Sequence, residues 1–119
     1  MTAGAAGRFT GHQVLVTGGG SGIGAATCRL FAREGAAVTV LDRDATTAAA
    51  VADEVGGRAA VADVRDGAAI TAAVREAAEA MGGLTDLVNN AGVGTARPLL
   101  DYTDKQWELL IGVNLTGTF

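Results

Sequence analysis

The strongest constraint on the fold is the glycine-rich run at residues 17–24, TGGGSGIG. It follows a short apolar segment, residues 13–17, and opens a stretch with helical periodicity, residues 22–34. A strand that turns through glycines into a helix exposes backbone without Cβ atoms beside the unpaired N–H groups of the first helical turn. Such a turn admits the pyrophosphate of a nucleotide, because a helix N-terminus attracts anions. No Gly-Lys-Ser/Thr sequence follows, which excludes a P-loop.

Apolar segments alternate with helical patterns along the rest of the chain. The segments predicted to be buried strands are residues 13–17, 37–41, 58–62 and 86–89. Helices are predicted at residues 22–34, with Ile23, Ala26, Leu30 and Phe31 on one face, at 44–55, from Asp66 to 81, and from Thr103 or Asp104 onward. Strand–helix alternation predicts right-handed crossovers and a parallel sheet covered on both faces. Residues 1–119 are predicted to form a single domain.

Composition narrows the class of protein. A chain of 119 residues supports one compact domain, and a net charge of −4 argues against a general nucleic-acid binder. The only cysteine is Cys28 and the only histidine is His12, which excludes an internal disulfide and argues against a metal site. Residues 1–11 lack a signal-like apolar stretch and no segment approaches membrane-spanning length, so we expect a cytoplasmic protein with no membrane association.

Asp42 ends the second predicted strand and is a candidate ligand for a ribose. A carboxylate at this place accepts both hydroxyl hydrogens of an adenosine ribose and repels a 2′-phosphate. The competing role, capping the next helix, is better suited to Asp44. Arg43, beside Asp42, favours a phosphate instead. We therefore expect NAD as the preferred cofactor, with NADP possible.

Two further polar segments follow strands. Residues 89–92, NNAG, end the fourth strand, and Asp63-Val64 follows the third. Ligands of open parallel sheets bind at the carboxyl ends of the strands, where these segments are expected to meet. Asp63 could accept a hydrogen bond from an adenine amino group or simply cap a turn. Residues 89–92 alone would be read as an ordinary Asn-Gly-type turn.

Taken together, the motifs resemble the short-chain dehydrogenase/reductase family in its common short form. The matching pieces are residues 17–24, 63–64, 89–92, Trp107 and 113–119 (VNLTGTF), in the family's order and spacing. The resemblance implies a doubly wound α/β parallel sheet of the Rossmann type, truncated after about four strands in the order 3-2-1-4. It also implies an NAD(P)-dependent oxidoreductase that moves hydride between a nicotinamide ring and a small-molecule alcohol or carbonyl, and a homo-oligomer when full length.

The resemblance also implies roles for individual residues. The pyrophosphate and its adjacent ribose would contact Gly18, Ser21, Gly22, Ile23 and Gly24. Asp42, beside Arg43, would hold the adenosine ribose. Asp63 and Val64 would meet the adenine, and the cofactor floor would be Asn90, Ala91 and Gly92. Asn114 resembles the family's active-site asparagine, which supports a kinked helix and holds a water in a proton relay.

The family's catalytic tyrosine and lysine have no match in this sequence. The family uses a lysine four residues after the tyrosine, and both come after the asparagine. Here the only pair, Tyr102 and Lys105, is three apart and precedes Asn114. The resemblance therefore implies the N-terminal half of an enzyme about twice as long. The alternatives are a non-catalytic nucleotide-binding module or pseudoenzyme fragment and, against residues 89–92 and Asn114, another Rossmann enzyme such as a methyltransferase.

Overall fold

Four parallel strands form one sheet in the computed structural model, which describes residues 7–94 and 97–119. The strands are β1 (Gln13–Thr17), β2 (Ala37–Asp42), β3 (Arg58–Val61) and β4 (Asp86–Val88). Their order, β3-β2-β1-β4, confirms the predicted order. Residues 1–6, part of the segment expected to lack a signal sequence, lie outside the described residues.

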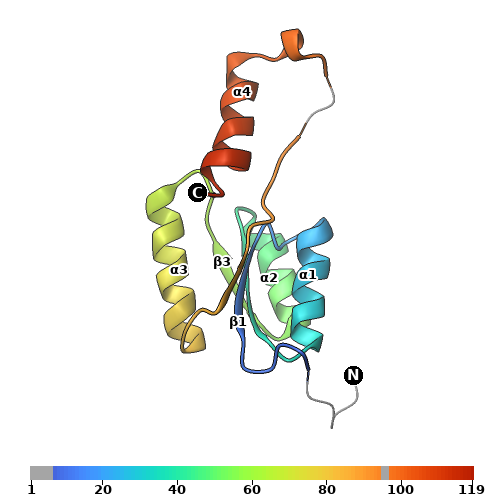
Figure 1. Cartoon of the computed structure of the whole chain (residues 1–119), viewed down its shortest axis with the longest axis vertical. Coiled ribbons are helices and arrows are strands. Elements are labelled where there is room, and N and C mark those ends of the chain that lie inside the picture. Colours follow the sequence, from blue (N-terminus) through green and yellow to red (C-terminus); the bar gives the residue numbers. More distant parts are fainter. Residues whose placement is uncertain (1–6, 95–96) are drawn as a thin grey trace.

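Helices cover both faces of this sheet, as predicted. They are α1 (Gly22–Arg33), α2 (Ala45–Val55), α3 (Gly67–Met81), the 3-10 turn η1 (Leu99–Asp101), α4 (Asp104–Ile111) and the π-helical turn η2 (Gly112–Thr116). Helices α1 and α2 lie on one side of the sheet and α3 on the other, while α4 stands beyond the carboxyl ends of the strands (Figure 1). None of the helices within the described ranges is long and apolar enough to cross a membrane.

The central strands are apolar on both faces because both faces are covered. Val14 and Val16 of β1 belong to the cluster packed under α1 and α2. Leu15, between them in sequence, points to the opposite face and packs with Ala73 and Ala77 of α3. This explains why β1 has a continuous apolar sequence rather than an alternating one.

Helices α2 and α3 begin at the predicted caps. The Asp44 carboxylate accepts hydrogen bonds from the N–H groups of Thr46 and Thr47, and Asp66 accepts one from Ala69. Each helix ends at a glycine with positive φ, 65° at Gly56 and 79° at Gly82. Asp44, and not Asp42, is therefore the residue that caps α2, as the sequence indicated.

The predicted face of α1 is wrong, because Ile23, Ala26 and Leu30 are exposed and only Phe31 is partly buried. Its buried residues are Gly24, Ala25 and Cys28, whereas Ile23 is 80% exposed and Leu30 44% exposed. A Cβ atom at Gly24 would lie 2.1 Å from the carbonyl oxygen of Gly18. The helix thus approaches the glycine loop so closely that only small residues fit between them, and larger apolar residues are displaced outward.

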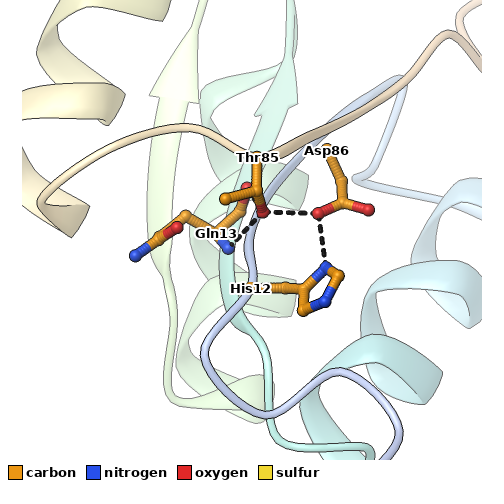
Figure 2. A network of polar contacts seen from close by, with 4 residues as sticks. All are labelled: His12, Gln13, Thr85 and Asp86. Atoms are coloured by element: carbon orange, nitrogen blue, oxygen red, sulfur yellow. Dashed lines mark hydrogen bonds and ion pairs between the residues drawn. The ribbon is translucent and has the colours of Figure 1, made fainter.

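A polar network joins the amino ends of β1 and β4 (Figure 2), at the end of the sheet opposite to α4 (Figure 1). His12 Nδ1 lies 2.7 Å from Asp86 Oδ1, and the N–H of Gln13 donates to Thr85 Oγ1 at 2.8 Å. The hydroxyl of Thr85 donates to Asp86, and this bond, followed by the one with His12, lowers the pKa of the Asp86 carboxyl. These contacts make His12 and Asp86 links between strands.

Candidate functional site

A cavity of about 370 Å³ opens at the carboxyl ends of the strands. The chain runs from β1 to β2 and β3 on one side of β1, and then returns to β4 on the other. Such a reversal is the place where open α/β sheets bind ligands. The cavity is lined by Gly18, Ser21, Ile23, Leu41, Asp42, Arg43, Ala62, Asp63, Val64, Asn90, Ala91, Gly92, Val93 and Val113. Among the predicted site residues, Gly22, Gly24 and Asn114 are not part of this lining.

The glycine loop is held tightly against neighbouring backbone. Gly18 has a φ of 63°, and a Cβ atom there would lie 2.9 Å from the Cα atom of Ala91. The N–H of Gly19 donates to the carbonyl of Leu41 at 3.0 Å. The next N–H, that of Gly20, donates to Asp42 Oδ2 at 3.0 Å. The end of β2 therefore fixes the first half of the loop and leaves the second half to face the cavity.

The N-terminus of α1 is open to an anion. Its N-cap, Ser21, makes no side-chain capping bond, and the first turn contains no acidic residue. The first intrahelical bond runs from the N–H of Ala25 to the carbonyl of Ser21, so earlier N–H groups have no intrahelical acceptor. Apart from its chain neighbours and the backbone of its own helix, no described atom lies within 4 Å of a Cβ built on Gly22. This end of the helix combines a positive partial charge with open space.

Asp42 lies at the cavity with both oxygens engaged. Oδ2 accepts the bond from Gly20, and Oδ1 accepts one from the N–H of Asp44 at 3.1 Å. A carboxylate has about four acceptor positions, so two remain for ligand hydroxyls. Asp42 thus shapes the glycine loop while keeping capacity for a ligand.

Asp63 faces the cavity and is paired with Arg65. Its Oδ1 accepts from the N–H of Arg65 at 2.9 Å, and its Oδ2 accepts from Nη2 of the same residue at 2.7 Å. These bonds are the main cause that lowers the pKa of Asp63 to about 2, with a smaller contribution from the charge of Arg43. Asp63 is therefore an ionised acceptor at neutral pH. Of the two alternatives left open in the sequence, the turn cap is present in the bond from the N–H of Arg65, and the contact with an adenine stays a prediction.

Asn90 and Thr17 clamp β4 to the glycine loop. The amide Nδ2 of Asn90 donates to the carbonyls of Thr17 and Gly18 at 3.1 and 3.2 Å. In return, Oγ1 of Thr17 accepts from the backbone N–H groups of Asn90 and Ala91, both at 3.0 Å. Sequence reasoning included Thr17 in the motif 17–24 but gave its side chain no role. Its signal is a hydroxyl residue at the end of an otherwise apolar strand.

Replacing Thr17 by valine is expected to destabilise the fold. Thr17 is 6% exposed, so valine would fill the same space but leave two part-buried N–H groups, those of Asn90 and Ala91, without their acceptor. Each lost acceptor should lower the free energy of unfolding by about 1–3 kcal/mol. Urea unfolding measures the change, and Thr17→Ser, which keeps the hydroxyl, is the matched control. A valine variant as stable as the wild type would contradict this role.

Asn114 lies in the π-helical turn η2 and grips a neighbouring backbone. Its Nδ2 donates to the carbonyl of Val93 at 2.8 Å, and its Oδ1 accepts from the N–H of Val93 at 2.9 Å. The π turn is a local irregularity that follows α4 directly. Asn114 is turned toward Val93 rather than into the cavity, which places it beside the cavity wall formed by Val93 and Val113.

The remaining reactive groups lie elsewhere. Burial raises the pKa of the Cys28 thiol to about 11, so it stays protonated. Tyr102, between η1 and α4, and Lys105, in the first turn of α4, are not among the cavity residues. Across residues 7–94 and 97–119, no three His, Cys, Asp or Glu side chains gather in a way that could hold a metal ion.

Comparisons with known proteins give a consistent result. The family model for short chain dehydrogenases matches residues 12–119. The NADP-dependent (R)-specific alcohol dehydrogenase of Lentilactobacillus kefiri is 36% identical over 116 residues, covering 94% of this chain and 46% of that protein. Galactitol 2-dehydrogenase (L-tagatose-forming) of Cereibacter sphaeroides is 42% identical over 114 residues, covering 94% and 45%.

Solved structures give the same picture. The crystal structure of 3-ketoacyl-(acyl-carrier-protein) reductase from Brucella melitensis complexed with NADH matches with a TM-score of 0.90 and 35% identity. The match covers 92% of this chain and 46% of that one. The chain therefore spans about half the length of these relatives.

Proposed function

Because the chain belongs to the short chain dehydrogenase family, we propose that it forms the cofactor-binding half of an enzyme that moves hydride between a nicotinamide cofactor and an alcohol/carbonyl pair. The observation that carries the proposal is the cavity at the carboxyl edge of the sheet. It brings together the open N-terminus of α1, the carboxylates of Asp42 and Asp63, and the segment 90–92. These groups suit the phosphate, sugar and base of a dinucleotide.

Each part of the cavity fits one part of the cofactor. Gly22, where a Cβ atom would meet no distant part of the described chain, leaves open space at the start of α1, which suits a pyrophosphate held by Gly18 and residues 21–24. Asp42 would accept the adenosine ribose hydroxyls, Asp63 and Val64 would meet the adenine, and residues 90–92 would form the floor. When bound, the cofactor supplies the hydride chemistry, and the protein orients it and excludes competing reactions.

We also propose which residues transfer the proton and which class of substrate is used. We assign Asn114 a role in a proton relay beside the cavity, supported by its fixed place against Val93. The tyrosine and lysine that would complete the relay are proposed to lie in the half that the relatives have beyond this match. The substrate is proposed to be a small-molecule alcohol or carbonyl and the full-length enzyme a cytoplasmic homo-oligomer.

A nucleotide-binding module without catalysis is the second candidate. It is favoured by the wrong spacing of Tyr102 and Lys105 and by their position outside the cavity lining. Oxidation of a panel of secondary alcohols by the full-length protein with NAD or NADP separates the two candidates. Turnover supports the dehydrogenase, whereas cofactor binding without any turnover supports the module.

Cofactor choice is expected to depend on Asp42. We propose NAD as the preferred cofactor, because the carboxylate accepts ribose hydroxyls and repels a 2′-phosphate. Asp42→Ala in the full-length enzyme should lower the NAD/NADP ratio of kcat/KM by at least about tenfold, the effect of losing one hydrogen bond to a charged group. Arg43→Ala is the matched control and should move the ratio in the opposite direction. An unchanged ratio in Asp42→Ala would refute the ribose role.

A further inference from the structure

Arg65 contacts both the cavity, through Asp63, and the π-helical turn η2, through Gly112. Its guanidinium is paired with Asp63 at the cavity, with Nη2 2.7 Å from Oδ2. Its aliphatic stem packs against Gly112 at the start of η2, where a Cβ atom would lie 2.9 Å from Arg65 Cδ. The neighbouring Val64 packs against Gly117 just past η2, where a Cβ would lie 2.6 Å from Val64 Cγ2. The loop after β3 therefore contacts the π turn at both ends.

The contacts that Arg65 makes with Asp63 fix the direction of the Asp63 carboxylate. Nε of Arg65 lies 3.1 and 3.2 Å from the two oxygens, in addition to the bond from Nη2 and the bond from the backbone N–H. A planar guanidinium that contacts both oxygens sets orientation as well as charge. Both side chains keep some access to solvent, 43% for Arg65 and 30% for Asp63. The clamp thus leaves the carboxylate accessible at the cavity.

We propose that Arg65 is a positioning residue that aims Asp63 at the adenine and links the adenine end of the cavity to the helical turn that carries Asn114. The inference rests on the proposed function, in which Asp63 receives the 6-amino group of adenine. It adds that Arg65, through Asp63, sets the preference for adenine over a base without that amino group. It adds further that the position of Arg65 depends on Gly112.

The test compares NADH with reduced nicotinamide hypoxanthine dinucleotide, which has an oxygen in place of the 6-amino group. Both affinities are measured by fluorescence titration of the full-length protein, and their ratio isolates the amino contact. Arg65→Met keeps the stem and removes the guanidinium. It should lower the preference for NADH by at least about threefold, as expected for the loss of one ordinary hydrogen bond. Arg65→Lys should restore part of the preference for NADH. The matched control is Arg75→Met, because Arg75 lies on the exposed face of α3.

Gly112→Ala tests the link to the π turn. The new methyl group would displace the flexible stem of Arg65 without strain in the helix, so the preference for NADH should fall. Combined with Arg65→Ala, which removes the stem, the same substitution should have no further effect. Additive effects in this double-mutant cycle would overturn the link to Gly112.

The outcomes separate this inference from the proposed function. A wild type that binds neither dinucleotide refutes the proposed function and this inference with it. A wild type that binds both equally well retains cofactor binding but overturns the inference. The inference is also overturned if Arg65→Met leaves the preference unchanged, or raises it, since a rise would make Arg65 a competitor for the carboxylate.

Discussion

Gly24→Ala is expected to abolish cofactor binding. A Cβ atom at this position would lie 2.1 Å from the carbonyl oxygen of Gly18 and 2.5 Å from Nδ2 of Asn90. The first contact is with backbone, so α1 or the loop must move, and either movement displaces the N–H groups proposed to hold the pyrophosphate. Overpacking of this kind should also lower the free energy of unfolding by about 1–3 kcal/mol.

Titration with NADH and urea unfolding measure the two effects of Gly24→Ala. Gly67→Ala is the matched control, because Gly67 is the first residue of α3 and a Cβ atom there would have no described atom within 4 Å apart from its chain neighbours and the backbone of its own helix. The control should keep wild-type affinity and stability. Wild-type NADH affinity in Gly24→Ala would contradict the close approach of helix and loop.

Asn114→Ala is expected to remove most of the turnover of the full-length enzyme. The substitution removes both bonds to the backbone of Val93 and, with them, the group proposed for the proton relay. Loss of a proton-transfer contribution should lower kcat by about a hundredfold or more. The affinity for NADH should change far less, because Asn114 does not line the cavity.

Asn114→Asp separates the relay from the structural bond. The carboxylate can still accept from the N–H of Val93 but, when ionised, it cannot donate to the carbonyl. We expect a kcat between those of the wild type and the alanine variant, measured by steady-state kinetics together with NADH titration. A kcat close to that of the wild type in Asn114→Ala would show that the asparagine serves only the fold.

The features that sequence predicts here are the local ones. The central strand β1 matches its predicted bounds, and the caps Asp44 and Asp66 satisfy N–H groups two or three residues away. Such signals need no knowledge of the rest of the chain. The strand order followed from the family resemblance together with strand–helix alternation.

The features that were missed depend on contacts between distant segments. The inward face of α1 is set by the approach of Gly24 to Gly18, which periodicity of apolar residues does not encode. Thr17 is explained only by its partners on Asn90 and Ala91, and Arg65 only by its simultaneous contacts with Asp63 and Gly112. Residues of these types are common, and the role of each one is decided by the distant residue that it contacts.

Hydrogen–deuterium exchange of the full-length protein with and without NADH tests the central claim most directly. The account predicts slower exchange at residues 18–24, 42–43, 63–64 and 90–93, the segments that line or shape the cavity. Exchange should be unchanged at the groove between α1 and α2 that is lined by Arg29, Arg33 and Glu54. Protection at that groove, or none at the glycine loop, would contradict dinucleotide binding at the carboxyl edge of the sheet.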